Sequence, residues 1–312
     1  MYAVRIKVND SAQDGGSVIK HILVDEALSK EFKIRGVTRD TSKPAAEALT
    51  KQGVEVVTAD LNSKDSLAAA IKGSHTVSLM TNYWEGSKQE VETAQGTAFA
   101  DASKEAGISH LIFSSLLNVT EESKGKLVHV PHFYGKADIE KYIRATGLPS
   151  TFVLPVYFMT NYTALRMMAK QEDGSYLLAY PVSKDAKFPL ILNQTWVNTF
   201  VDKACLFVKA AIKNQSKVPG NQILAAADYY TPEQIVAEFT EVTGKKDNFV
   251  QVPSKVYKSF LPPAIAHEML ENHLFVEEPG YYAGRSLEES HALLDGKLIT
   301  WTDFLKRNIT EF

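Results

Sequence analysis

The chain has 312 residues, of which 45% are hydrophobic and 23% are charged, as is typical of a soluble globular protein. Its formal net charge of −3 argues against direct binding to nucleic acid, which needs a basic face, and no run of about 18 apolar residues predicts a membrane span. The single cysteine, Cys205, excludes an intrachain disulfide, and one cysteine among scattered histidines predicts no metal site.

The N-terminus and Cys205 indicate a cellular compartment. The first ten residues, MYAVRIKVND, carry charges within their apolar stretch and lack a small-residue cleavage site, so we expect no secretory signal. A single cysteine suits a reducing compartment, which predicts the cytoplasm, with the nucleus as a second location. Because Cys205 lies in an apolar helical pattern, we expect a buried small hydrophobe there.

Strand-like and helix-like patterns alternate along the first half of the chain. The predicted strands span residues 2–8, 32–38, 54–60, 75–81, 110–116 and 150–156, and the predicted helices span 16–28, 44–52, 63–73, 88–107 and 134–147. Gly53, Gly73, Gly107 and Gly147 each follow a helical pattern, where a helix-ending glycine belongs. The alternation predicts an α/β fold with a Rossmann-like doubly wound parallel sheet, and residues 1–155 form the expected NAD(P)-binding domain.

The pattern changes after residue 155. Residues 156–312 predict a smaller, mainly α-helical C-terminal domain, with one or two strands returning to the main sheet. We expect a strand in 173–182, a helix in 197–213, a strand and a proline-started helix in 221–244, and a helical tail interrupted by prolines. In that tail, Ile265, Met269 and Leu270 either face a protein partner or pack on their own domain.

The first strand and the turn that follows it are unusual. A central parallel strand is expected to be apolar on both faces, yet Arg5 and Lys7 interrupt this one, which leaves open a frayed or displaced strand. The turn that should carry the phosphate-binding glycines reads VNDSAQDGGSV, with Asn9, Ala12 and Gly15 at glycine spacing.

In a doubly wound sheet, ligands bind beyond the carboxyl ends of the strands, so the residues there are the candidate site. Arg39 ends the second strand, where an arginine accommodates the 2′-phosphate of NADP, and Lys43 adds a second positive group. The alternative is a solvated pair beside a loop. Asp60 ends the third strand and either accepts a hydrogen bond from the adenine amino group or caps the next helix.

The fourth and fifth strands end in TNYWE and FSSL. Thr81, Asn82, Tyr83 and Trp84 suit the lining of a nicotinamide or a flat substrate, although paired aromatics also occur as simple packing. A serine at the fifth strand, followed by Tyr-x-x-x-Lys, would be typical of short-chain dehydrogenases, in which the tyrosine transfers the proton. Lys136 is in place, but His132 stands where the tyrosine belongs. The only Tyr-x-x-x-Lys match, Tyr180 to Lys184, falls outside the order of the sheet.

Six motifs along the chain together resemble the NmrA-like family of atypical short-chain dehydrogenases. In chain order they are GVTRD, TNYWE, HLIFSSL, HFYGK, GLPSTFVLPVYF and DGSYLL. The family includes fungal regulators of nitrogen metabolite repression and a human redox sensor. The resemblance implies a Rossmann domain with a smaller C-terminal domain, NADP binding without a need for turnover, and regulation through protein partners such as transcription factors. It also implies the following roles: Arg39 and Lys43 at the 2′-phosphate, Thr81, Asn82 and Tyr83 toward the nicotinamide, Lys136 at the ribose, and Tyr157 and Phe158 closing the cleft.

The chain departs from the family in its first turn. Family members carry G-x-x-G-x-x-G or a variant that begins with Asn, and here Asn9, Ala12 and Gly15 fill those places. Ala12 adds a methyl group where the backbone should approach the pyrophosphate. Asp10 and Asp14 bring carboxylates toward a helix N-terminus that should meet an anion. A carboxylate about 4 Å from a phosphate charge costs about 1 kcal/mol in water and about 4 kcal/mol at an effective dielectric of 20.

Three functions compete. The first is an NADP(H)-binding, redox-sensing regulator that acts through protein partners. The second is an NADPH-dependent reductase of a quinone or another small molecule, in which Lys136 or His132 replaces the missing tyrosine as the catalytic group. The third is a nucleotide-free scaffold, which the altered turn at Asp10, Ala12 and Asp14 favours.

Overall fold

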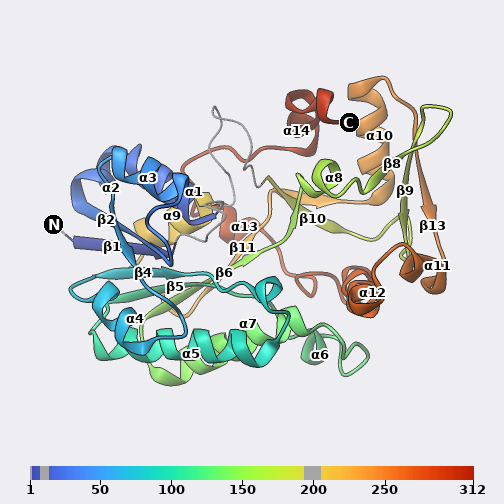
Figure 1. The fold of residues 1–312 in the computed structure, drawn as a ribbon. Helices are drawn as coiled ribbons and strands as arrows, with labels where there is room; N and C mark the ends of the chain where they lie inside the picture. Colours follow the sequence, from blue (N-terminus) through green and yellow to red (C-terminus); the bar gives the residue numbers. More distant parts are fainter. Residues whose placement is uncertain (1, 8–13, 193–204) are drawn as a thin grey trace.

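The computed structural model describes residues 2–7, 14–192 and 205–312. Within them, a parallel seven-stranded sheet forms the centre of the N-terminal half (Figure 1). In spatial order its strands are β11 (Gln222–Ala225), β6 (Ser150–Pro155), β5 (His110–Ser114), β4 (Thr76–Leu79), β1 (Tyr2–Lys7), β2 (Phe32–Thr38) and β3 (Glu55–Thr58). The order reverses between β1 and β4, which is the switch point where such sheets bind ligands.

Helices cover both faces of this sheet (Figure 1). One face carries α1 (Asp14–Leu23), α2 (Glu26–Glu31), α3 (Pro44–Lys51) and α9 (Cys205–Lys213). The other face carries α4 (Lys64–Ile71), α5 (Gln89–Glu105) and α7 (Pro131–Thr146). The Rossmann-like doubly wound architecture predicted from the sequence is confirmed.

Residues that end or begin helices, such as glycines and capping side chains, set the helix boundaries, and one of these boundaries differs from the prediction. Gly53, Gly73, Gly107 and Gly147 all adopt a positive φ after their helices, a conformation that glycine reaches without steric cost. The single helix predicted over 16–28 is wrong, because it divides into α1 and α2. Asp25 causes the division: its carboxylate accepts hydrogen bonds from the backbone N–H groups of two α2 residues and caps a new helix.

The first strand is not displaced. β1 pairs in parallel with both β2 and β4, in the middle of the sheet, as the backbone register shows. The charges at Arg5 and Lys7 therefore did not indicate a strand outside the sheet.

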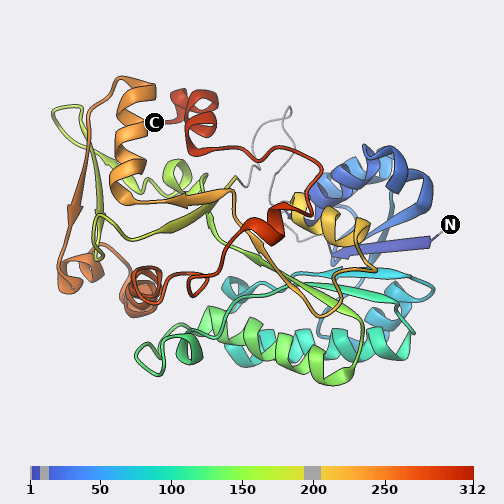
Figure 2. The ribbon, with the colours of Figure 1, turned by 180° about the vertical axis from the view of Figure 1, so that it is seen from behind.

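The C-terminal half adds two small sheets and several helices (Figures 1 and 2). Its strands, ordered β12-β10-β7 and β13-β9-β8, are β7 (Tyr157–Phe158), β8 (Met168–Lys170), β9 (Tyr176–Tyr180), β10 (Phe188–Ile191), β12 (Asp228–Tyr230) and β13 (Asp247–Gln251). Its helices are α8 (Asn161–Ala164), α10 (Pro232–Thr243), α11 (Ser254–Ser259), α12 (Pro263–Glu277), α13 (Glu288–His291), α14 (Trp301–Arg307) and the 3₁₀ turn η2 (Ile309–Glu311). Two further short elements, η1 (Tyr83–Glu85) and α6 (Val119–Glu122), belong to the N-terminal half.

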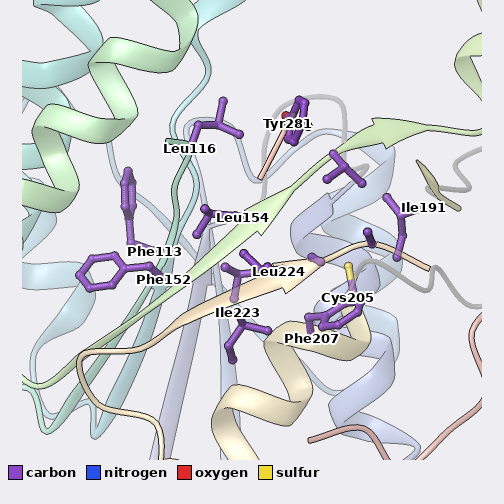
Figure 3. Close-up of a cluster of buried hydrophobic side chains, with 14 of the residues drawn as sticks. Phe113, Leu116, Phe152, Leu154, Ile191, Cys205, Phe207, Ile223, Leu224 and Tyr281 are labelled. Atoms are coloured by element: carbon purple, nitrogen blue, oxygen red, sulfur yellow. The ribbon is translucent and has the colours of Figure 1, made fainter. Parts of the chain in front are cut away.

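One strand, β11, returns to the main sheet, where it pairs in parallel with β6. Seen from behind, this strand joins the edge of the sheet from the C-terminal part of the chain (Figure 2). A continuous apolar core runs from the sheet into this region (Figure 3). Cys205 lies buried in that core beside Phe207, as expected. No helix in the described part of the chain combines the length and hydrophobicity needed to cross a bilayer.

Candidate functional site

A cleft of about 530 Å³ opens at the carboxyl ends of β2, β3 and β4, a volume ordinary for a small-molecule site. Its walls come from these strand ends and from η1, α4 and α5. The lining includes five of the residues singled out from the sequence, namely Arg39, Asp60, Asn82, Tyr83 and Trp84. The chain therefore brings the ends of three neighbouring strands to one hollow, as the fold dictates for a ligand site.

Arg39 forms an ion pair with Glu85. The arginine directly follows the last residue of β2, and Glu85 is the last residue of η1, so the pair links these two elements in the cleft wall. Both side chains are about half exposed, and an ion pair in that position contributes at most about 1 kcal/mol. The guanidinium can thus exchange Glu85 for another anion at little cost. Lys43 occupies the N-cap position of α3 and is not among the described residues that line the cleft.

Asp60 lies in the cleft wall with its carboxylate turned into its own loop. Oδ1 accepts hydrogen bonds from the backbone N–H and the side-chain amide of Asn62, both at 2.9 Å. The alternative role as a helix cap is wrong, because Ser63 is the N-cap of α4 and accepts from the N–H of Ser66. Asn62 also lines the cleft, so Asp60 and Asn62 together offer polar groups at the end of β3.

Lys136 is held in a buried network behind the cleft. Its ammonium donates to the Thr81 backbone carbonyl at 3.0 Å, to Thr81 Oγ1 at 2.9 Å and to Glu92 Oε1 at 2.7 Å. The Thr81 hydroxyl in turn donates to the same Glu92 oxygen at 2.6 Å. Only 12% of the Lys136 side chain and 1% of the Glu92 side chain are exposed. An ammonium has three protons, and these three acceptors use all of them.

Glu92 was missed by the sequence reasoning, although the sequence contained a signal for it. The residue lies on the buried face of α5, in register with Gly96, Phe99 and Ser103. A carboxylate on the apolar face of a helix needs a partner of opposite charge. On α7, Gly135 leaves room for it, because a Cβ at that position would come within 2.7 Å of Glu92 Oε2.

His132 connects the cleft to the C-terminal half. Its Nδ1 is hydrogen-bonded to Glu268 Oε1 of α12, and its backbone N–H donates to the same oxygen at 3.1 Å. The ring of His132 packs against the rings of Trp84 and Tyr83, with centroids 5.2 and 6.1 Å apart. Burial raises the pKa of Tyr83, and the carboxylates of Glu268 and Glu92 add to the shift, so this phenol stays protonated at neutral pH.

Tyr157 and Phe158 lie elsewhere. Neither is among the described residues that line the cleft. They form β7, and the Tyr157 ring packs against Phe188, His273 and Tyr281 at the start of the C-terminal half. The Tyr157 hydroxyl is buried without a hydrogen-bond partner in the described structure, and burial raises its pKa well above the usual range.

The remaining predicted residues lie at the first turn. Asn9 and Ala12, like Asp10, fall outside the described residues. Gly15 is the second residue of α1, which begins at Asp14 after β1. The discounted match, Tyr180 to Lys184, belongs to the C-terminal half, where Tyr180 is buried beside Phe188 and Lys184 is an exposed partner of Glu233.

Comparisons with known proteins support this architecture. The NmrA-like oxidoreductase malD of Malbranchea aurantiaca is 29% identical over 262 residues, which cover 79% of this chain and 74% of that protein. The nitrogen metabolite repression protein nmrA of Emericella nidulans is 28% identical over 207 residues, or 65% of this chain and 55% of that protein. The crystal structure of NmrA, a negative transcriptional regulator, in complex with NADP superposes with a TM-score of 0.80 at 22% identity, covering 99% of this chain and 97% of the other.

The sequence model that describes the NmrA-like family matches residues 8–305, nearly the whole chain. This chain belongs to the NmrA-like family.

Proposed function

We propose that this chain binds NADP(H) in the cleft beyond β2, β3 and β4 and acts as a redox-sensing regulator through protein partners. The observation that carries the proposal is the position of Arg39, in the cleft wall directly after β2. The second strand of a dinucleotide-binding sheet ends beside the adenosine ribose, and an arginine there accommodates a 2′-phosphate. Asp60 and Asn62, which are hydrogen-bonded to each other, line the cleft at the end of β3, where we place the adenine.

The surroundings of Lys136 favour a regulator over a reductase that uses this lysine. A proton donor or a ribose-binding group needs a hydrogen available to the ligand. Here the three ammonium protons point to Thr81 and Glu92, and the aromatic acid of the short-chain dehydrogenases is replaced by His132. Lys136 therefore acts as a structural cation beneath the cleft, and the nicotinamide lacks the usual proton relay.

A sensor must distinguish NADPH from NADP⁺, because a ligand shifts a conformational equilibrium only by its differential affinity for the two states. The relatives include both oxidoreductases and a nitrogen metabolite repression protein. By analogy, we infer that the readout is association with a transcription factor or a similar regulatory protein, in the cytoplasm or the nucleus.

The test combines binding and turnover on one preparation. NADPH and NADP⁺ are each titrated by calorimetry, and NADPH oxidation is then followed by absorbance with a panel of quinones and other small acceptors. We expect affinities that differ at least tenfold between the two nucleotides, and no oxidation above the protein-free rate. Equal affinities would contradict a redox sensor, and NADPH oxidation above the protein-free rate would contradict a purely regulatory role.

One observation favours the second candidate, an NADPH-dependent reductase of a quinone or another small molecule. The hydrogen bond between His132 Nδ1 and Glu268 orients the imidazole, and the ring contacts Trp84 at the cleft. A carboxylate that fixes a histidine in this way is a common arrangement for a general acid. Turnover that is lost in His132→Gln but kept in Lys136→Arg would identify this mechanism. If the protein binds neither nucleotide, the third candidate, a nucleotide-free scaffold, is the function that remains.

A further inference from the structure

Three potential metal ligands meet where the N-terminal half contacts α12. His129 lies just before α7, and His267 and Glu271 are four residues apart on one face of α12. Their ligand atoms are close together: His129 Nδ1 to Glu271 Oε1 is 2.7 Å, His267 Nε2 to the same oxygen is 3.2 Å, and the two nitrogens are 3.2 Å apart. The sequence predicts no metal site because its histidines are scattered along the chain, and His129 and His267 are 138 residues apart.

The carboxylate of Glu271 is fixed before any ion arrives. Its second oxygen, Oε2, accepts hydrogen bonds from the backbone N–H groups of Val128 and His129 at 2.7 and 2.6 Å. Groups that orient a ligand in this manner typically accompany metal sites.

The spacing suits a tetrahedral ion. Zinc lies about 2.0–2.2 Å from imidazole nitrogens and carboxylate oxygens, which places tetrahedral ligands about 3.3 Å apart. Two of the three measured separations match this value, and the third must lengthen by about half an ångström. We propose that His129, His267 and Glu271 form a binding site for a divalent transition-metal ion, with Zn²⁺ as the best fit.

The surroundings define what kind of site this is. The side chain of Glu271 is 9% exposed, whereas those of His129 and His267 are 59% and 52% exposed, so an ion reaches the site from solvent. Three protein ligands leave a fourth position open to water or to a ligand from another molecule. Because the ligands come from both halves, the bound ion would fasten α12 to the start of α7, one helical turn from the contact between His132 and Glu268.

The experiment uses the full chain without a polyhistidine tag, stripped of metal by a chelator and then dialysed. Zn²⁺ is titrated by calorimetry, and Co²⁺ is added as a spectroscopic probe whose visible absorption is intense only in a tetrahedral site. His129→Asn and His267→Gln keep a hydrogen-bonding group near the position of the lost nitrogen but remove the metal ligand. The matched control is His291→Gln, which removes an imidazole that contacts the Ala226 carbonyl, outside the site.

We expect one Zn²⁺ per wild-type chain and a tetrahedral Co²⁺ spectrum. Each of the two site variants should weaken binding at least about tenfold, since even groups that merely orient a ligand are worth about 10–100-fold, and His291→Gln should bind like the wild type. The proposal is overturned if the wild type binds no Zn²⁺, or if both site variants bind as the wild type does. Circular dichroism of each variant confirms its fold. No nucleotide is needed, so the result is independent of the proposed function.

Discussion

Lys136 illustrates, at the scale of single residues, how a sequence motif and a structural role can separate. Its place after the fifth strand resembles the lysine of the short-chain dehydrogenases, yet its ammonium is bound to Thr81 and Glu92. Burying an ion pair is costly, and removing one partner is costlier still, since it leaves a buried charge without a partner. The need to pair the buried Glu92 carboxylate therefore accounts for a lysine at this position without any role in catalysis.

Asp247 makes a second prediction at this scale. Burial raises the pKa of this β13 carboxyl to about 7, and its Oδ2 has no hydrogen-bond partner in the described structure. A group whose pKa is raised on folding costs no stability below its unfolded pKa, near 3.8, and lowers stability progressively as the pH rises toward 7. Asp247→Asn should therefore increase the free energy of unfolding by up to about 4 kcal/mol at pH 8, at about 1.4 kcal/mol per pKa unit, and by much less at pH 4.

Urea denaturation of the wild type and Asp247→Asn at the two pH values measures this difference. Asparagine keeps an oxygen that can accept the hydrogen bond of the Asn248 N–H, which Asp247 Oδ1 accepts at 2.8 Å. An equal change at pH 4 and pH 8 would show that the substitution acts through packing and not through ionisation.

At the scale of elements, the close packing of α5 on α7 shapes the rear of the cleft. A Cβ at Gly96 of α5 would overlap three side-chain carbon atoms of Ile139 on α7. Glycine weakens a helix by about 1 kcal/mol relative to alanine, but here it lets the two helices approach. The same approach brings Lys136 of α7 to Glu92 of α5.

We predict that Gly96→Ala lowers the free energy of unfolding by about 1–3 kcal/mol, as overpacking of a core usually does, despite the better helix propensity of alanine. Chemical denaturation gives the value. Ala94→Gly, on the exposed face of the same helix, measures the propensity effect alone and should cost about 1 kcal/mol. A gain in stability for Gly96→Ala would mean that the two helices are not packed as described.

The elements also show which parts of the fold could be predicted from the sequence. The strand predicted over 32–38 matches β2, and the helix predicted over 88–107 contains α5, because both have clear periodicity and end signals. The small sheets of the C-terminal half were mostly missed. Their strands have two to five residues, too few for a period-two pattern to appear, and apart from the β8–β9 pair they pair across long stretches of chain.

Part of the candidate site could also be predicted from the sequence, and part could not. Parallel strands bring their carboxyl ends to one edge of the sheet, which predicts a shared cleft for Arg39, Asp60, Asn82 and Tyr83. Glu85, Glu92 and Glu268 could not be assigned as partners of Arg39, Lys136 and His132. Those pairs are 46, 44 and 136 residues apart and depend on how η1, α5 and α12 pack.

At the scale of the whole molecule, the two halves are joined by more than the chain. β11 extends the main sheet beyond β6, and Tyr282 and Tyr281 donate hydrogen bonds to the backbone carbonyls of Leu154 and Pro155 at 2.6 and 3.2 Å. An isolated 1–155 fragment would expose β6 as an unpaired apolar edge, which favours aggregation. We predict that this fragment is aggregated or lacks a cooperative unfolding transition, whereas the full chain unfolds in one transition.

Differential scanning calorimetry and light scattering of the two proteins check this prediction. A soluble, monomeric 1–155 fragment with a sharp transition near that of the full chain would contradict it, and would show that the predicted N-terminal domain is an independent folding unit.

The central claim is that the cleft selects NADP(H) through Arg39, and the most direct measurement is calorimetric titration of NADP⁺ and NAD⁺ into the wild type, Arg39→Ala and Glu85→Gln. Hydrogen bonds to charged groups contribute about 1.5–3 kcal/mol, so Arg39→Ala should weaken NADP⁺ binding about tenfold or more and change NAD⁺ binding little. Glu85→Gln removes the competing carboxylate and should strengthen NADP⁺ binding. Equal wild-type affinity for the two nucleotides, unchanged in Arg39→Ala, would contradict the claim, as would a folded protein that binds neither.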